Sequence, residues 1–364
     1  MKPISIYIHI PFCVKKCSYC DFASYAGKFD LVEDYFDHLY KELKKTLEAF
    51  PLEIKTLFIG GGTPTTVALS YYQSLMKILA PYMLKDCEAS IEANPGTITL
   101  EYLKGLKALG FNRLSIGAQS FNPHELALLG RIHTKEEIVR SFNESRKAGF
   151  TNINLDLMFA LPEQTLESWI SSLDQAIDLS PEHISAYNLQ LEEGTPLFDT
   201  INKKGALLRK ANQEIDLEMY ETLLQKMAKA NYKHYEISNF AKDGFECRHN
   251  MNYWLNGNYI GFGSGAHSHM NGARWENPKA IEEYLAKTYD PSPFGRGVRS
   301  EGSGETIFLG LRLIEGIPLS LFDNYKEKLD KLIGEGFLKI SNGKVSFTKK
   351  GLLLGNLVFE EFVE

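Results

Sequence analysis

The chain has 364 residues, of which 44% are hydrophobic and 24% are charged, a composition typical of a globular protein with a large core. Its formal net charge of −6 provides no basic surface for nucleic acid, so we expect no nucleic-acid partner. No apolar run approaches the ~18–20 residues of a membrane span, and Met1 is followed by a strand rather than a signal-peptide pattern.

Three of the five cysteines, Cys13, Cys17 and Cys20, fall within eight residues as C-x3-C-x2-C. This crowding argues against a secreted disulfide framework, so we expect a cytoplasmic protein. Thiolates favour iron–sulfur clusters or zinc. A [4Fe–4S] cluster normally takes four cysteines, so three would leave one iron open. Structural zinc would need a fourth ligand, His9 or Asp21. The remaining alternative is three unligated cysteines in a buried turn.

Six short apolar runs predict β-strands, and segments of helical periodicity separate them. The predicted strands are Ser5–Ile10, Thr56–Ile59, Glu88–Ala93, Arg113–Gln119, Asn152–Phe159 and His183–Gln190. This alternation favours an α/β fold with a parallel sheet. Six units predict an open, partial (β/α)6 barrel.

The helix ends are predicted from cap residues. The expected N-caps are Asp30, Ser70, Thr99 and Thr134, the last forming a capping box with Glu137. Gly110 and Gly149 are expected to follow the ends of two of these helices.

Polar residues and glycines recur where the predicted strands end. These are Gly60-Gly61-Gly62-Thr63 after the second strand, Glu92, Gln119 and Gln190 at the ends of later strands, and the alternating Asn152, Asn154 and Asp156 in the fifth. Each alone is compatible with a turn, an ion pair or a helix cap. Their recurrence at successive strand ends indicates a barrel mouth that holds a cofactor, because a packed interior would be apolar.

The segment from Tyr7 to Phe22, Y-I-H-I-P-F-C…C-S-Y-C-D-F, resembles the cluster loop of the radical S-adenosylmethionine (SAM) superfamily. It is most similar to the branch that contains oxygen-independent coproporphyrinogen III oxidases and haem chaperones, and the resemblance covers nearly the whole chain. It implies a [4Fe–4S] cluster on Cys13, Cys17 and Cys20 whose open iron is chelated by SAM.

The same resemblance implies a set of SAM-binding residues, some of which contact a second SAM molecule in the family. They are Tyr7, Tyr19, Gly61, Gly62, Thr63, Glu92, Gln119, Arg131, Asp156 and Gln190. At Tyr19, Arg131 and Gln190 only spacing and neighbouring residues align, and Arg131 is equally compatible with a solvated surface charge. No catalytic residue is assigned.

A second motif, H-N-x-x-Y-W, starts at His249. On residue chemistry alone, a histidine beside aromatics is either a haem ligand or a structural residue. The motif resembles the one that marks the haem-chaperone branch, which implies that His249 binds haem, with Cys247 as the alternative ligand. The glycine-rich stretch at residues 261–269 is expected to close the open side of the barrel.

The C-terminal part predicts a small winged-helix-like α+β domain. Residues 289–304 are rich in turn formers and indicate a linker. Helices are expected at Glu305–Ile314 and Leu321–Ile333, followed by a hairpin of Phe337–Ile340 and Lys344–Phe347 around Asn342-Gly343. The expected division is residues 1–290 for the barrel, including H-N-x-x-Y-W, and 291–364 for linker and tail.

Two functions follow from the resemblance. The first is a haem chaperone that passes haem to an acceptor haemoprotein, such as a membrane respiratory enzyme. The second is a coproporphyrinogen III oxidase, in which an electron donor drives SAM cleavage. The sequence has Phe22 where the oxidase has a further cysteine, and a shorter segment before Cys13, and both differences favour the chaperone. The acceptor, the oligomeric state and SAM cleavage stay open.

Overall fold

The computed structural model describes residues 3–50, 52–203, 213–287, 299–300 and 304–362. All six predicted strands are present, and each pairs in parallel with the next one along the chain. They are β1 (Ile4–Ile10), β4 (Ile54–Gly61), β5 (Met83–Ala93), β6 (Arg113–Gln119), β7 (Ile153–Phe159) and β8 (His183–Asn188). The predicted partial (β/α)6 barrel is therefore confirmed.

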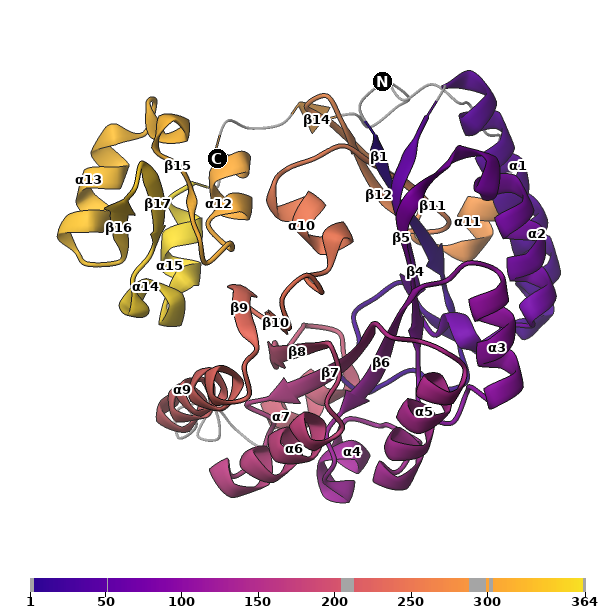
Figure 1. The fold of residues 1–364 in the computed structure, drawn as a ribbon, viewed down its shortest axis with the longest axis horizontal. Helices are drawn as coiled ribbons and strands as arrows, with labels where there is room; N and C mark the ends of the chain where they lie inside the picture. Colours follow the sequence, from indigo (N-terminus) through magenta and orange to yellow (C-terminus); the bar gives the residue numbers. More distant parts are fainter. Residues whose placement is uncertain (1–2, 51, 204–212, 288–298, 301–303, 363–364) are drawn as a thin grey trace.

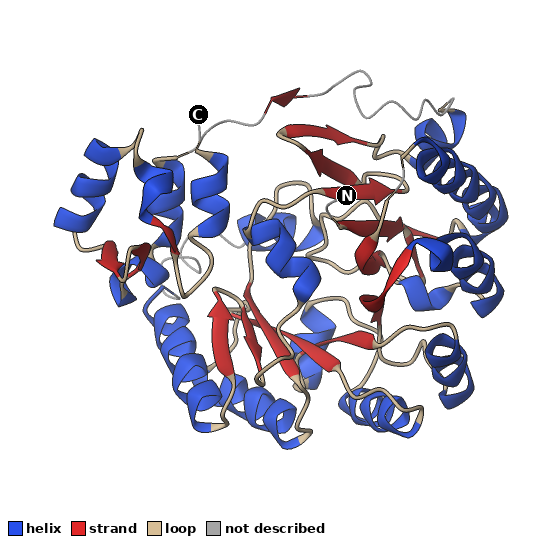
Figure 2. Cartoon of the chain, turned by 45° about the horizontal axis from the view of Figure 1, so that its top comes forward, coloured by secondary structure: helices blue, strands red, loops and turns tan. Residues whose placement is uncertain are grey.

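Helices cover the convex outer face of this curved sheet (Figures 1 and 2). They are α1 (Val32–Ala49), α2 (Leu69–Leu79), α3 (Leu100–Ala108), α4 (Pro123–Leu128), α5 (Lys135–Lys147) and α6 (Leu166–Asp178). Each longer helix packs one apolar stripe on the sheet, as α1 does with Phe36, Leu39 and Leu43. Every helix in the described residues is too short or too polar to cross a membrane.

Two of the four predicted N-caps are confirmed. Thr99 accepts a hydrogen bond from Tyr102 N, and Thr134 forms the capping box with Glu137. The other two predictions were wrong. Asp30 lies inside a 3-10 turn that precedes α1, and Ser70 lies within α2, which starts one residue earlier.

The sheet extends beyond the six strands on both sides, to twelve strands within the described residues. On the β1 side the added strands are β11 (Tyr259–Phe262), β12 (His267–Met270), β13 (Ala273–Glu276) and β14 (Arg299–Ser300); beyond β8 they are β10 (Asn239–Ala241) and β9 (Lys233–Glu236). The glycine-rich stretch therefore adds β11 in parallel to β1, and the expectation that it closes the barrel was wrong.

Helix α10 (Arg248–Trp254), which carries H-N-x-x-Y-W, lies on the concave side of the sheet (Figure 1). Beyond it, the C-terminal elements have a hydrophobic core of their own. They are α12 (Glu305–Gly310), β15 (Ile317–Pro318), α13 (Lys326–Gly334), β16 (Leu338–Ser341), β17 (Lys344–Phe347), α14 (Lys349–Leu353) and α15 (Gly355–Glu360). Residues 288–298 lie outside the described part, so the division at residue 290 stays a prediction.

The predicted hairpin is present, since β16 and β17 pair antiparallel. Asn342 and Gly343 both have positive φ, 51° and 72°, as the tight turn between such strands requires. Both predicted helices are shorter than expected. The first ends at Gly310 and the second begins at Lys326, after a 3-10 turn at Leu319–Phe322.

Candidate functional site

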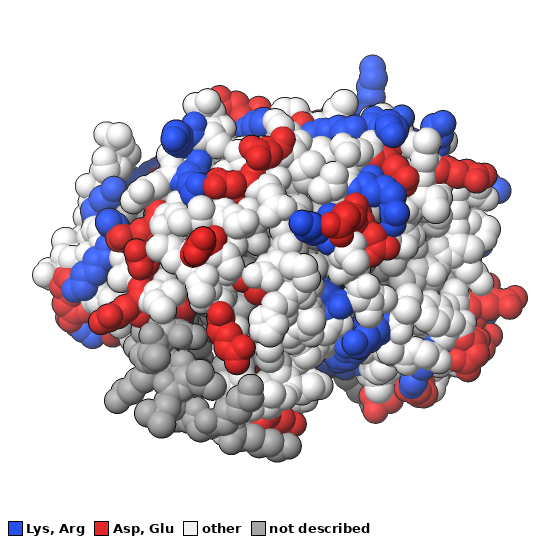
Figure 3. All heavy atoms as spheres, turned by 90° about the horizontal axis from the view of Figure 1, so that it is seen from below, with Lys and Arg blue, Asp and Glu red and all other residues white. Residues whose placement is uncertain are grey.

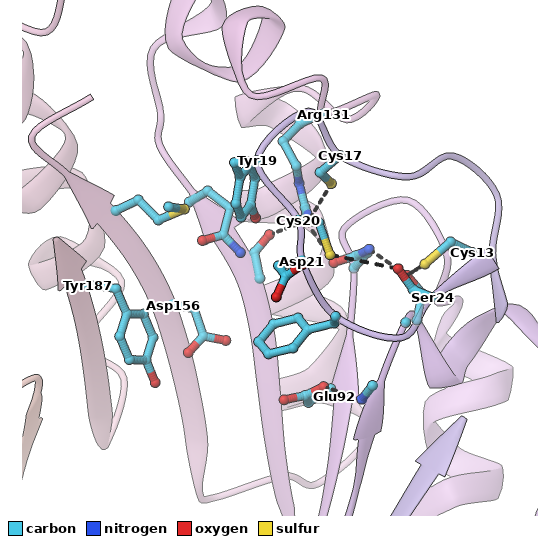
Figure 4. A pocket seen from close by; sticks show the side chains of 18 of the residues that line it. Cys13, Cys17, Tyr19, Cys20, Asp21, Ser24, Glu92, Arg131, Asp156 and Tyr187 are labelled. Atoms are coloured by element: carbon cyan, nitrogen blue, oxygen red, sulfur yellow. Dashed lines mark hydrogen bonds between the residues drawn. The ribbon is translucent and has the colours of Figure 1, made fainter. Parts of the chain in front are cut away.

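A cavity of about 500 Å³ opens at the carboxyl ends of the barrel strands, and all three clustered cysteines line it (Figure 4). Nine of the ten residues expected to bind SAM line the same cavity: Tyr19, Gly61, Gly62, Thr63, Glu92, Gln119, Arg131, Asp156 and Gln190. The tenth, Tyr7, lies deeper in β1, where its hydroxyl is 3.0 Å from His9 Nδ1. The strand ends therefore bring these residues together, although they are far apart in sequence.

Backbone and side-chain bonds hold the cysteine loop against the barrel. His9 Nε2 lies 2.7 Å from Ala23 O, and Tyr25 N donates to Pro11 O at 2.7 Å. In the middle of the loop, Ser18 donates from its hydroxyl to Leu128 O at 2.7 Å. The loop is thus fixed at several points independently of any bound metal.

The three cysteines are free thiols. Burial raises the pKa of Cys13. Within the described residues, no group of three or more His, Cys, Asp and Glu side chains is placed to hold a single metal ion. The zinc alternative also loses His9 as fourth ligand, because both of its ring nitrogens have hydrogen-bond partners. Three thiols around one cavity fit a [4Fe–4S] cluster with one open iron.

The triple glycine allows the cysteine loop to approach β4 closely. Gly61 has φ +118°, and a Cβ there would lie 2.7 Å from the His9 ring. A Cβ on Gly62 would lie 2.9 Å from Cys13 Sγ. A side chain at either position would displace the residues that support the thiols, so neither is a clean probe of ligand binding.

Two partly buried carboxyl groups face the cavity. Glu92 accepts a hydrogen bond from Gly61 N at 3.1 Å, and burial together with the Asp156 charge raises the pKa of Glu92 to about 8. Asp156 accepts from Asn154 Nδ2 at 2.8 Å and from Ser115 Oγ at 3.0 Å, and burial raises its pKa. Two such carboxyls suit a ligand with a positively charged group, because a nearby positive charge favours the ionised form of a carboxyl group.

Gln119 is a backbone outlier at the end of β6. It has φ 64°, unusual for a residue with a Cβ, and a register shift separates it from Gly117. A Cβ on Gly117 would meet Gln119 Nε2 at 2.9 Å. Strained backbone of this kind is common at binding sites.

Arg131 is not a solvated surface charge. Its Nη2 donates to Asn94 Oδ1 and to Gly117 O, both at 2.6 Å, and its Nη1 lies 3.5 Å from Cys17 Sγ. Asn94 was not predicted as a site residue. Its position just beyond Glu92, after the end of β5, is the signal that could have identified it.

His249 lies outside this cavity, in the barrel interior. Its side chain is stacked on Phe58, with Nδ1 2.8 Å from Thr56 Oγ1 and Nε2 2.9 Å from Tyr253 OH. Burial lowers the pKa of His249 to about 3. Haem ligation through His249 therefore requires one of these two hydrogen bonds to break.

Cys247, the alternative haem ligand, is also buried. Its Sγ lies 3.7 Å from Glu88 Oε1, and burial raises its pKa to about 12, so it is a neutral thiol at physiological pH. Glu88 accepts from the backbone N of Arg248 and of His249, both at 3.0 Å, and so caps α10.

The cavity mouth is partly apolar. Phe22 lines it with 68% of its surface exposed, and Tyr187 is 39% exposed. On the face of the molecule seen from below, Lys and Arg side chains are interspersed with Asp and Glu side chains (Figure 3).

Comparisons with known proteins match this arrangement. The model of the radical SAM superfamily matches residues 7–176, and that of the HemN C-terminal domain matches residues 304–354. The haem chaperone HemW of Bacillus subtilis is 38% identical, covering 99% of each chain, and that of Escherichia coli is 36% identical, covering 100% of this chain and 99% of the relative. The solved structure of coproporphyrinogen III oxidase (HemN) from Escherichia coli superposes with a TM-score of 0.81 and 25% identity, covering 99% of this chain and 90% of that one.

Proposed function

The chain belongs to the HemW family of the radical SAM superfamily, and from this membership we propose that it is a haem chaperone. It binds haem on a radical-SAM scaffold and transfers it to acceptor haemoproteins. The similarity to HemW relatives over the full length of both chains carries this proposal, because it includes the barrel, α10 and the C-terminal elements together.

We propose that Cys13, Cys17 and Cys20 hold a [4Fe–4S] cluster. When bound, the cluster supplies an open iron for SAM and an electron for reductive chemistry. Gly61, Gly62, Glu92 and Asp156 line the same cavity, where the two carboxyl groups would hold the positively charged groups of SAM. The other lining residues named above complete the pocket, and Tyr7 supports it from β1.

The acceptor is a haemoprotein, and we propose a respiratory enzyme as its class. An electron donor is required only if SAM is cleaved. Five free thiols suit a reducing compartment, so we propose a cytoplasmic location.

Coproporphyrinogen III oxidase is the second candidate, because the HemN structure superposes over nearly the whole chain and the three clustered cysteines line one cavity. Phe22, where the oxidase has a further cysteine, argues against it.

One experiment separates the two candidates. The reconstituted protein is mixed anaerobically with haemin, and then with an apo-haemoprotein, while a parallel sample receives SAM, a reductant and coproporphyrinogen III. We expect haem binding and its transfer to the acceptor, without formation of protoporphyrinogen IX. Decarboxylation without haem transfer would establish the oxidase instead.

Substitution of Glu92 tests the SAM site. We expect Glu92→Gln to weaken SAM binding by roughly tenfold or more, because it removes a charge that a cationic ligand needs. Iron and sulfide content should stay unchanged, since Glu92 contacts no thiol in the described residues. Asn188→Ala, on the same cavity, is the control. Equal SAM affinity in Glu92→Gln and wild type would remove Glu92 from the site.

Glu92 also predicts a pH dependence of the SAM-free protein. Its pKa is about 8 when folded and near 4.5 when unfolded, so between these values the folded state holds the extra proton. The free energy of unfolding should therefore fall as pH rises from about 4.5 to about 8. Glu92→Gln should flatten this slope, measured by denaturant titration at several pH values. A slope identical to wild type would contradict the assignment.

A further inference from the structure

Each of the three clustered thiols has at least one polar side chain beside it, and Cys13 has both Thr63 and Ser24 as hydrogen-bond partners. Thr63 Oγ1 lies 3.6 Å from Cys13 Sγ, Arg131 Nη1 lies 3.5 Å from Cys17 Sγ, and Ser24 Oγ lies 3.7 Å from Cys20 Sγ (Figure 4). These three side chains come from the loop after β4, the segment after α4 and the cysteine loop itself.

Asn94 joins two of these three neighbours. Its Nδ2 donates to Thr63 Oγ1 at 2.8 Å, and its Oδ1 accepts from Arg131 Nη2 at 2.6 Å. A continuous chain of contacts therefore runs from Cys13 through Thr63, Asn94 and Arg131 to Cys17. Ser24 contacts the thiols of Cys20 and Cys13 and, within the described residues, neither Asn94 nor Arg131.

This series of contacts determines which donor hydrogen points at the sulfur of Cys13 and which at the sulfur of Cys17. Because Asn94 Nδ2 donates to the Thr63 oxygen, the Thr63 hydroxyl hydrogen is free to point at Cys13. Because Nη2 of Arg131 is held by Asn94 and by Gly117 O, its planar guanidinium turns Nη1 toward Cys17.

The backbone just before Arg131 is also held in place. Ser18 N, in the cysteine loop, donates to Leu129 O at 3.0 Å, two residues before Arg131. Between them, Gly130 has φ +72°, and a Cβ there would lie 3.0 Å from Ser18 N. The segment that carries Arg131 is therefore hydrogen-bonded to the cysteine loop and packed closely against it.

From this geometry we propose that Asn94 is a positioning residue that sets the reduction potential of the cluster by holding Thr63 and Arg131 as donors to two of its thiolates. The proposal rests on the cluster proposed above. Reduction adds negative charge to the cluster and its sulfur ligands, and donors aimed at sulfur stabilise that charge. Loss of Asn94 releases both donors at once and makes the cluster harder to reduce.

The test is a redox titration of reconstituted protein without SAM, followed by electron paramagnetic resonance. We expect Asn94→Ala to lower the midpoint potential by the equivalent of about tenfold in the reduction equilibrium, which is ~59 mV for one electron. Asn188→Ala, the same change on the same cavity away from the chain of contacts, should leave the potential at the wild-type value.

A double-mutant cycle tests whether Asn94 acts through its neighbours. Thr63→Val removes the hydroxyl at nearly constant volume. Because Asn94 holds this hydroxyl, we expect the shift in midpoint potential of the double variant to be smaller than the sum of the two single shifts. Ser24→Ala removes a donor to Cys20 and Cys13 that Asn94 does not hold in the described residues, so its effect should add to that of Asn94→Ala.

Iron and sulfide content separates the outcomes. A wild-type preparation without iron and sulfide would overturn the cluster, and with it this proposal. Wild-type potential in a cluster-loaded Asn94→Ala protein, or full additivity with Thr63→Val, would overturn the positioning role and leave the cluster intact. If Asn94→Ala does not assemble the cluster, the same comparison is made with Arg131→Lys, which keeps the charge and loses the fork. An unchanged potential there overturns the role equally.

Discussion

Cys17→Ser is expected to yield a folded chain that holds no [4Fe–4S] cluster after anaerobic reconstitution. Iron should fall from about four per chain to below about one, with a parallel loss of sulfide, because two remaining thiolates cannot hold the cubane. Cys13→Ser and Cys20→Ser should behave in the same way. The measurement is iron and acid-labile sulfide per chain, together with the visible absorption of the cluster.

The remaining two cysteines provide matched controls. Cys87 and Cys247 are both buried, and burial raises the pKa of each to about 12, so neither supplies a thiolate at neutral pH. Cys87→Ser and Cys247→Ser should keep the full iron and sulfide content. A cluster retained in Cys17→Ser, or stoichiometric zinc without sulfide in wild type, would contradict the assignment.

We expect the cysteine loop to keep its conformation when one thiol is lost, because hydrogen bonds to the rest of the protein hold it in place. His9, Ser18 and Tyr25 bond its backbone to the barrel and to the segment after α4. We therefore expect circular dichroism of Cys17→Ser to match wild type. This distinguishes loss of a ligand from loss of the fold.

The barrel was predictable because its strands and helices carry local signals. The runs at β1 and β6 are apolar and bounded by turn residues, and Thr134 with Glu137 defines a helix start. The short strands β9 and β10 were not predicted, because three or four residues carry too little periodicity to stand out.

The sequence predicted which residues lie together at the cavity, but it did not predict the hydrogen bonds between them. Strand-end position predicted Glu92 and Gln119, and period-two alternation within the fifth strand predicted Asp156; all three residues line the cavity. Asn94 was missed because the positioning role that we propose for it depends on two partners, Thr63 and Arg131, that only the folded chain brings within reach.

The interior position of His249 could not be predicted either. The motif marks the residue, while its environment comes from Tyr7 on β1 and from Thr56 on β4, which lies 193 positions earlier in the chain. Glu88 on β5 anchors the start of α10 and thereby places the ring inside the barrel. Any haem-binding role must begin from this closed arrangement.

His249→Ala is expected to lower haem affinity by at least about tenfold, because the resemblance of its motif implies that His249 is the haem ligand. The titration uses haemin and follows the Soret band, with cluster content and SAM binding measured in parallel. Both should stay at wild-type values, because His249 does not line the cluster cavity. Since the substitution also removes two buried hydrogen bonds, thermal unfolding of each variant is compared with wild type.

Tyr253→Phe is the matched variant that separates ligation from structural support. It removes the hydroxyl that occupies His249 Nε2 and leaves the imidazole in place, so ligation should become easier and haem affinity should equal or exceed that of wild type. A structural role predicts the reverse, since the loss of the same bond would then weaken haem binding in both variants.

The low pKa of His249, about 3, adds a second check, because the ring stays neutral and able to bind iron from pH 8 down to pH 5. Haem affinity through this ligand should therefore be flat over that range, whereas a solvent-exposed histidine ligand would lose affinity below its ordinary pKa near 6.5.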